Sequence, residues 1–426
     1  MDSKKTITHD GVDFVIAVDD RLLLKMINAG KRKDITIPHK FPSGETITGL
    51  DESFCVGSYG QINISDGITD VWPYAFHRAQ IQSVRWSSSC KMIEQGCFLE
   101  STVEQVTNID GVEVIEEEAF RGSCVCDFTW PTKCETIPIS CFNESNLKVI
   151  HNLDNVDEVR SFAFGHCQIE SFIWPPKCKS IPEHCFYGAI KLKSISNIEH
   201  VIEIGEGAFG YANLDEFTWP SGCKDIPPNC FADSSIKAIS NIDNVESVGE
   251  FAFSSSGIFS ITWPAKCKAI PSHCFYASKL KSISGIENVE IVGISAFICC
   301  SLTSFVWPEK CVCIPSGCFA GCEVLESISN IDKVQVIEDS AFSSTNIKSM
   351  VYPSSCKCIP KRCFSSCLKL TEVTNLDNVV CIEESAFEYS PNVKLDLSGA
   401  KITCVGEDAF KDVNEGNVIF PYYSTF

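Results

Sequence analysis

Residues 217–253 read FTWPSGCKDIPPNCFADSSIKAISNIDNVESVGEFAF, a stretch made of two half-units that end alike, at Phe231 and Phe253. The first half-unit follows the pattern WPxxCKxIPxxCF, and the second follows NIDNVExxGxxAF. This pair recurs along nearly the whole chain, with 22 or 23 residues between successive closing phenylalanines. A fixed period of that length predicts a repeat solenoid of stacked turns rather than a globular enzyme. The closing residues are Phe54, Phe76, Phe98, Phe120, Phe142, Phe164, Phe186, Phe209, Phe231, Phe253, Phe275, Phe297, Phe319, Phe342, Phe364, Phe387 and Phe410.

These positions predict about 17 turns of 22–23 residues. Each turn is expected to begin with a short strand whose side chains alternate inward and outward, and Pro227 and its counterparts exclude a regular helix from the return segment. Residues 1–34 do not follow the repeat and are predicted to cap the first turn, with a strand at 14–18 and a short helix at 21–28 between Asp20 and Gly30. The solenoid is expected to span residues 35–415, and a last strand and tail residues 416–426.

Composition narrows the classes of partner. The formal net charge of -20 argues against nucleic acid or an anionic membrane, because both require a basic surface. The longest apolar runs are far shorter than the roughly 18 residues of a membrane-spanning helix, and no signal-peptide core is recognisable. We therefore expect no membrane insertion, and these features taken alone favour a cytoplasmic location.

The 26 cysteines follow the repeat. Eight residues before the closing Phe, cysteine alternates with valine, as in Cys223 and Val245; directly before the Phe it alternates with alanine, as in Cys230 and Ala252. A residue that exchanges with valine and alanine behaves as a small buried hydrophobe, so we expect free buried thiols. Disulfides within a turn, such as Cys223 to Cys230, and zinc binding are the alternatives, although no histidine recurs at a zinc-finger spacing. We expect no cofactor and no metal site.

The order of strand, Ile-Pro or Ile-Gly, Ala-Phe or Cys-Phe, and a small residue three positions later resembles the BspA-like leucine-rich repeat, over roughly residues 35–420. The resemblance implies a right-handed coil with one parallel β-sheet. Many BspA-like proteins of bacteria and protists are surface antigens or adhesins. It therefore implies a non-enzymatic protein at the cell surface that mediates protein–protein or cell–matrix contact. The alternative is an intracellular leucine-rich-repeat scaffold, which the unpaired cysteines favour.

A column of aromatic residues alternates with asparagine at the end of successive strands. Each aromatic residue lies two positions after an inward strand residue and therefore faces the core. We expect buried tryptophans whose indole N–H groups reach an Asn oxygen, and the alternative is an exposed ladder that binds glycans. The aromatic residues are Trp86, Trp130, Trp174, Trp219, Trp263, Trp307 and Tyr352, and the asparagines are Asn108, Asn152, Asn197, Asn241, Asn330 and Asn375.

The outward strand positions are rich in serine and threonine and form the candidate binding face, for a protein (host-matrix, cell-surface or intracellular) or a glycan. The charged residues among them, Arg85, Asp127, His151, Glu216 and Glu372, are the predicted specificity determinants. The simpler explanation is that Ser and Thr suit exposed strands. The predicted face comprises Arg85, Thr107, Asp127, Thr129, His151, Glu216, Thr218, Ser240, Ser260, Thr262, Ser282, Ser284, Ser304 and Glu372.

No sequence feature indicates catalysis. The GxGxxG match at 205–210 lies within one repeat turn and has no strand–turn–helix context. His184 and Cys185 resemble the base and the nucleophile of a cysteine protease, but that cysteine belongs to a core column. We therefore predict no catalytic residues.

Overall fold

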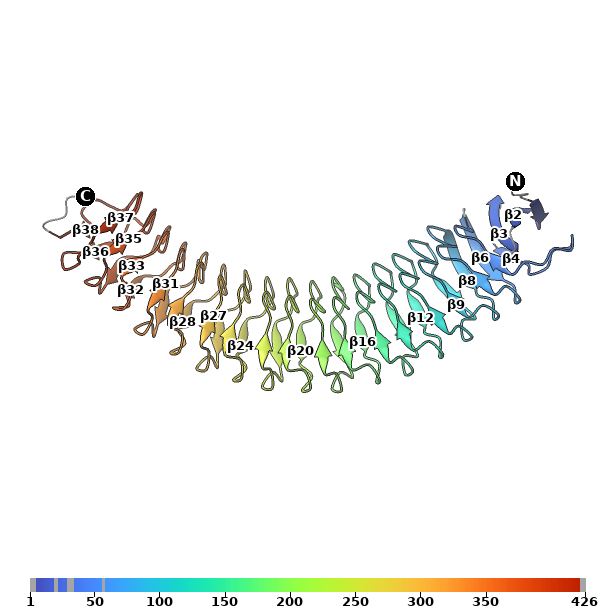
Figure 1. Ribbon diagram of the computed structural model, residues 1–426, viewed down its shortest axis with the longest axis horizontal. Coiled ribbons are helices and arrows are strands. Elements are labelled where there is room, and N and C mark those ends of the chain that lie inside the picture. The colour runs from blue at the N-terminus through green and yellow to red at the C-terminus, as the bar shows by residue number, and fades with distance from the viewer. Residues whose placement is uncertain (1–4, 19–21, 29–33, 56–57, 422–426) are drawn as a thin grey trace. The chain divides into compact units, whose positions relative to one another are not determined.

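The computed structural model describes residues 5–18, 22–28, 34–55 and 58–421, and within these residues it contains strands and no helix. The chain divides into two compact units, Met1–Asn213 and Leu214–Phe426. Each unit consists of stacked turns, whose strands Figure 1 shows side by side within the unit. The predicted parallel repeat solenoid is confirmed, with about 18 turns in place of about 17. The further turn begins at strand β38 (Val418–Ile419), which pairs with the preceding turn.

The first unit opens with three antiparallel strands, β1 (Lys5–His9), β2 (Val12–Val18) and β3 (Leu22–Asn28). Asp10 and Gly11 form the two-residue turn between β1 and β2, with φ of 50° and 74°. Two successive left-handed residues are what a tight hairpin turn requires, and Asp-Gly is a preferred pair for it. This sequence signal was missed.

The predicted helix over residues 21–28 is wrong where the structure describes it, because residues 22–28 are strand β3. Leu24 and Met26 are buried while Lys25 between them is half-buried, which is the period of a strand. Pairing with β2 thus overrides the helix propensity of the Leu- and Met-rich stretch. The expected flanking signals at Asp20, Arg21 and Gly30 lie outside the described residues.

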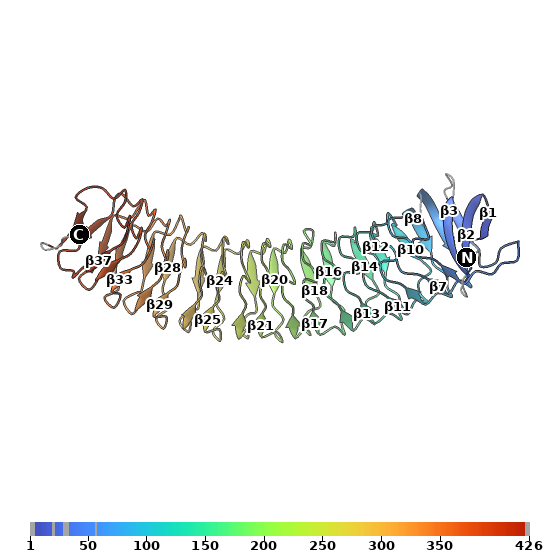
Figure 2. The ribbon, with the colours of Figure 1, turned by 45° about the horizontal axis from the view of Figure 1, so that its top comes forward.

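Each turn contributes two strands, so every unit carries two rows of parallel strands, which Figure 2 separates. In the first unit, the first row is β4 (Asp34–Ile37), β6 (Ser58–Ile64), β8 (Gln80–Arg85), β10 (Gln105–Thr107), β12 (Asp127–Thr129), β14 (Val149–His151), β16 (Ser171–Ile173) and β18 (Ser194–Ser196). The second row is β5 (Gly49–Leu50), β7 (Asp70–Val71), β9 (Met92–Ile93), β11 (Val114–Ile115), β13 (Thr136–Ile137), β15 (Glu158–Val159), β17 (Ser180–Ile181) and β19 (Glu203–Ile204).

The second unit has the same two rows. Its first row is β20 (Glu216–Thr218), β22 (Ala238–Ser240), β24 (Ser260–Thr262), β26 (Ser282–Ser284), β28 (Ser304–Val306), β30 (Ser327–Ser329), β32 (Ser349–Val351), β34 (Glu372–Thr374), β36 (Lys394–Asp396) and β38. Its second row is β21 (Asp225–Ile226), β23 (Ser247–Val248), β25 (Ala269–Ile270), β27 (Ile291–Val292), β29 (Cys313–Ile314), β31 (Val336–Ile337), β33 (Cys358–Ile359), β35 (Cys381–Ile382) and β37 (Cys404–Val405).

The sequence predicted one parallel sheet, which corresponds to the first row. The structure has the second row of parallel strands in addition. The strands of this second row have only two residues, and in all of them except β5 the first is more exposed than the second, as Thr136 and Ile137 illustrate. The inward residue lies opposite its counterpart in the next turn, for example Ile137 opposite Val159. Pro138 then ends β13, because proline cannot donate to a parallel ladder.

The closing phenylalanines form the centre of the core in each unit. Phe98 and Phe120 are fully buried and their rings stack with centroids 5.3 Å apart and planes 5° from parallel. The backbone follows the same stacking, since the N–H of Phe142 donates to the carbonyl of Ala163 in the next turn at 2.9 Å. Each ring therefore packs against its counterpart one turn away, and no turn has a complete core by itself.

Candidate functional site

Most strands of the first row have three residues, of which the first and third are exposed and the second is buried or half-buried. In β12, Asp127 and Thr129 are exposed while Phe128 is buried. We call the outward positions of these strands the strand face; it includes Arg85, the half-buried last residue of β8, which lies opposite Thr107 of β10. All fourteen residues of the predicted binding face lie on it, because the alternation of a strand places every second side chain on the same side.

In the first unit the strand face carries Arg85, Thr107, Asp127, Thr129 and His151. The structure brings two of them together, with His151 Nε2 3.2 Å from Asp127 Oδ1 on the neighbouring strand. Arg85 is instead 3.9 Å from the carboxylate of Asp66 outside the face. Exposed pairs of this kind stabilise by less than about 1 kcal/mol, so these side chains stay available to a partner.

A hollow of about 750 Å³ lies over strands β14 and β16 of the first unit. Its lining includes His151, Ser171 and Ile173, with Lys148 and Glu170 among its charged residues. The side chain of Ile173 is 70% exposed. This part of the face therefore combines an exposed aliphatic group with a histidine and charges of both signs.

In the second unit, hydroxyl groups pair across adjacent strands of the face. Ser240 donates to Thr218 at 3.3 Å, and Thr262 lies 3.3 Å from Ser284. A second hollow, of about 550 Å³, is lined by Ser284, Val306 and Trp307 among others. The nine predicted face residues of this unit are Glu216, Thr218, Ser240, Ser260, Thr262, Ser282, Ser284, Ser304 and Glu372, and all are exposed.

The sequence reasoning missed the apolar members of this face. Ile173, Val306 and Val351 occupy the third strand position, where most turns carry Ser or Thr, and all three are largely exposed. Their positions were readable, since each directly precedes Trp174, Trp307 or Tyr352 of the aromatic column. Exposed aliphatic groups among hydroxyls are what a protein partner can bury, whereas a purely polar face suits a glycan equally well.

The predicted burial of the aromatic column is confirmed, since Trp130, Trp174, Trp219 and the other members are fully buried. A glycan ladder formed by these rings is therefore wrong. The predicted indole partner is also wrong: Trp130 Nε1 donates to the carbonyl of Cys134 at 2.9 Å, and Trp174, Trp219 and Trp307 repeat this contact with the cysteine four residues on.

The asparagines fulfil a different role. Asn241 has a φ of 61° and its Nδ2 donates to the carbonyl of Trp219 at 2.6 Å. Asn tolerates the left-handed region better than most residues, and its amide supplies a donor where the strand ladder ends. Asn108, Asn152, Asn197, Asn330 and Asn375 make the same contact one turn back.

We expect Asn241→Ala to lower the free energy of unfolding by about 2–3 kcal/mol, from a lost hydrogen bond and from left-handed strain on a residue with a Cβ. Asn241→Gly is the matched control, because Gly285 holds the same position with a φ of 74°. It loses the hydrogen bond alone and should cost about 1 kcal/mol. Urea denaturation followed by circular dichroism measures both; equal losses would show that strain plays no part.

The two cysteine columns are buried as predicted. Cys141 and Cys185, which directly precede closing phenylalanines, have no exposed surface, and burial raises the pKa of both thiols well above the ordinary range. A thiol that is fully buried in apolar surroundings, as these are, is out of reach of solvent and is not a nucleophile. The one disulfide among the described residues joins Cys381 to Cys404, one turn apart and outside both columns. It is therefore not of the within-turn kind considered from the sequence.

His184 and Cys185 are not arranged as a catalytic pair. His184 stacks on Phe162 with centroids 4.6 Å apart and lies 3.1 Å from the Glu183 carboxylate, while Cys185 points into the core. The GxGxxG match lies at the return of one turn, where Gly205 comes close to the backbone of Glu183. Within the described part of the chain, no helix is both long enough and apolar enough to cross a lipid bilayer.

Comparison with known proteins gives one family and several solved structures. A family model described as BspA type leucine rich repeat region (6 copies) matches residues 33–145, 113–237, 203–311 and 290–417, about nine-tenths of the chain. No curated protein matches the chain in sequence. The crystal structure of a leucine-rich repeat protein from Bacteroides ovatus covers 99% of this chain and 98% of its own, at 19% identity and a TM-score of 0.64, which shows a shared fold.

Two further crystal structures are less similar. A leucine rich cell surface protein from Faecalibacterium prausnitzii covers 90% of this chain and 96% of its own at 20% identity, with a TM-score of 0.41. The pneumococcal vaccine antigen PcpA covers 96% of this chain and 100% of its own at 14% identity, with a TM-score of 0.38. At these scores neither contributes to the functional argument.

Proposed function

Because the chain belongs to the BspA-type leucine-rich repeat family, we propose that it is a binding protein whose strand face docks a protein partner, in the manner of a surface antigen or adhesin. Leucine-rich-repeat proteins generally bind protein partners, and the family is typically non-enzymatic. The observation that carries the proposal is the composition of the strand face, where Ile173, Val306 and Val351 stand exposed among hydroxyls and a few charges.

The chemistry of this face favours a protein over the other classes of partner. Apolar side chains release water when a partner covers them, and the neighbouring hydroxyls can exchange hydrogen bonds with water for hydrogen bonds with the partner. His151, Asp127 and the charges around the hollow of the first unit then supply selectivity. Cell–matrix or cell–cell contact is the specific role that we propose for this docking.

An intracellular scaffold is the second candidate. It is favoured by the cysteines, since 24 of them form no disulfide in the structure and cysteines stay reduced in a reducing compartment. Intact source cells labelled with a membrane-impermeant biotin reagent distinguish the two locations. Label on this protein with a silent cytosolic marker supports the surface role; absence of label supports the scaffold.

We expect Val306→Lys to weaken binding to the partner by tenfold or more, because a charge would be buried at the centre of the interface. Binding is measured with the full chain against immobilised extracellular-matrix proteins and against intact cells. Ile291→Lys is the matched control, since Ile291 is equally exposed but lies on a second-row strand, β27. Equal loss in both variants, or no loss in either, would contradict docking on the strand face.

A further inference from the structure

Four cysteines lie on the outward side of the second strand row: Cys313 in β29, Cys358 in β33, Cys381 in β35 and Cys404 in β37. They belong to neither buried column, and earlier turns carry residues such as Glu158 or Ser180 at this position. Cys358 lies opposite Cys381 in the parallel register, and Cys381 lies opposite Cys404. Three sulfur atoms are therefore placed one behind another on three successive turns.

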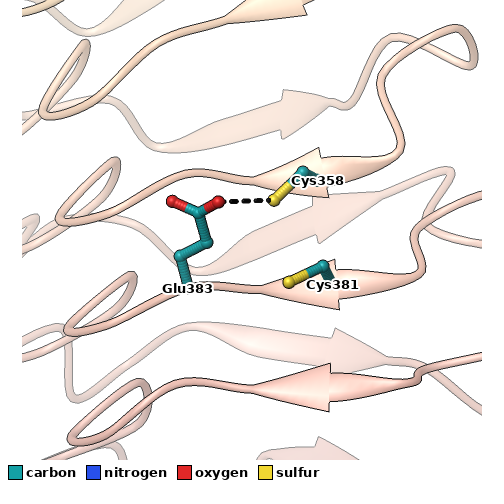
Figure 3. Close-up of side chains that lie close together, drawn as sticks. All are labelled: Cys358, Cys381 and Glu383. Atoms are coloured by element: carbon teal, nitrogen blue, oxygen red, sulfur yellow. Dashed lines mark hydrogen bonds between the residues drawn. The ribbon is translucent and has the colours of Figure 1, made fainter.

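A carboxylate completes the group. Glu383 Oε1 accepts a hydrogen bond from the Cys358 thiol at 3.3 Å, and Oε2 accepts one from the backbone N–H of Lys361 at 3.1 Å. The sulfur atoms of Cys358 and Cys381 and an oxygen of Glu383 all lie within 4.8 Å of one another. Figure 3 shows the carboxylate turned toward Cys358, with Cys381 on the adjacent strand. All three residues are half-buried, so an ion from solvent can reach them.

In the structure Cys381 is bonded to Cys404, with Cα atoms 4.8 Å apart. A sulfur atom held in a disulfide cannot act as a thiolate ligand, so the donor set is complete only after that bond is reduced. Cys404 itself lies one strand further from Cys358, roughly 9–10 Å away at the usual strand spacing. Two thiolates on one zinc ion are at most about 4.6 Å apart, so Cys404 cannot share an ion with Cys358.

We propose that Cys358, Cys381 and Glu383 form a binding site for zinc or a similar soft divalent cation, and that the Cys381–Cys404 disulfide closes this site when it is oxidised. Two thiolates and one carboxylate with an open fourth position are a ligand set that zinc accepts. The Lys361 N–H donates to Oε2 of Glu383 and so holds the orientation of the carboxylate, as hydrogen-bond donors to metal ligands commonly do. This inference does not depend on the proposed docking function.

The chemistry balances with a dithiol as the reductant. Its two sulfurs form their own disulfide, while the Cys381–Cys404 bond takes up two electrons and two protons and becomes two thiols. When the cation binds, the thiols of Cys358 and Cys381 release their protons to water and their sulfurs bond to the ion. The thiol of Cys404 keeps its proton. Reoxidation of Cys381 and Cys404 by a small-molecule disulfide reverses the sequence and frees the ion.

The chain contains a matched site that lacks one thiol. Cys313 and Glu338 are 3.8 Å apart, and Glu338 Oε2 accepts the N–H of Ser316 at 2.9 Å, as Glu383 does with Lys361. The position opposite Cys313 is Val336 instead of cysteine. With one thiol and one carboxylate, this site should not retain a cation, and it provides the template for the control variants.

The test is zinc content after dialysis, measured by elemental mass spectrometry on the full chain, and cobalt(II) titration read by its thiolate charge-transfer band. We expect the dithiol-reduced protein to retain one more equivalent of zinc than the oxidised protein. Cys381→Val should abolish that equivalent, whereas reduced Cys404→Ser and Cys313→Val should keep it. Glu383→Gln, which preserves the size of the side chain, should weaken zinc binding at least about tenfold. It replaces Cys381→Val as the test of the donor set if that variant does not fold.

Equal zinc content before and after reduction would overturn the redox control of the site. Equal content in wild type and Cys381→Val, or unchanged affinity in Glu383→Gln, would overturn the donor set. Loss of zinc in Cys404→Ser would also overturn it, because Cys404 would then be a ligand.

Discussion

Raising the pH from about 8 to about 11 is expected to unfold the protein under reducing conditions, because many buried thiols must stay protonated in the folded state. Burial raises the pKa of Cys55, Cys167 and Cys300 to about 12, from a usual value near 9. The unfolded chain therefore releases these protons first as the pH rises. The stabilisation is complete below about pH 9 and is lost as the pH rises toward 12.

Each such thiol lowers the free energy of unfolding by about 1.4 kcal/mol per pH unit within this window. At pH 11 the three thiols together lower the free energy of unfolding by roughly 8 kcal/mol, which is comparable with the whole stability of a typical domain. The fully buried cysteines that precede closing phenylalanines act in the same direction, since burial raises the pKa of Cys97, Cys141, Cys185, Cys230, Cys274, Cys318 and Cys363 well above the ordinary range.

The measurement is urea denaturation at several pH values, followed by far-ultraviolet circular dichroism. Cys167→Ala separates the thiol from lysine and tyrosine titration, because Ala189 and Ala212 fill the same buried column in neighbouring turns. We expect the free energy of unfolding of this variant to fall by about 3 kcal/mol less than that of wild type between pH 9 and 11. The same pH dependence in both proteins would show that the thiol of Cys167 does not control alkaline stability.

Trp130→Ala is expected to lower the free energy of unfolding by about 3–5 kcal/mol. The side chain is fully buried, and its ring centroid lies 6.0 Å from that of Phe128 and 6.2 Å from that of Phe142. Its N–H donates a hydrogen bond to the carbonyl of Cys134. Removing it leaves a cavity between aromatic rings and a buried carbonyl without its donor. The same denaturation experiment measures the loss.

Two further variants, one at residue 130 and one at the neighbouring residue 129, separate the contribution of the indole N–H from that of the ring volume. Trp130→Phe keeps most of the ring volume but not the N–H, so we expect a smaller loss of about 1–3 kcal/mol. Thr129→Ala changes the exposed neighbour on the same strand and should cost less than about 1 kcal/mol. Wild-type stability in Trp130→Ala would place the indole outside the core.

The candidate site could be located from the sequence, but its character could not be read completely. Strand alternation was enough to place all fourteen predicted residues, from Arg85 to Glu372, on the outward side of the first-row strands of their units. The contact between Asp127 and His151 required the register of β12 and β14 and the directions of both side chains. The hollow beside Ile173 depends on how far neighbouring side chains extend, which residue type alone does not state.

The sequence by itself determined the repeat, the closing phenylalanines and the buried columns. Substitutions between turns, such as Cys223 for Val245, report directly how much volume and polarity one position of the turn accepts. Tertiary structure alone decided that residues 22–28 pair as strand β3, that the Trp130 indole reaches a backbone carbonyl, and that Cys358, Cys381 and Glu383 meet. A period aligns residues of the same column, whereas these contacts join different columns, and only the register and the side-chain directions in the folded turns bring such residues within bonding distance.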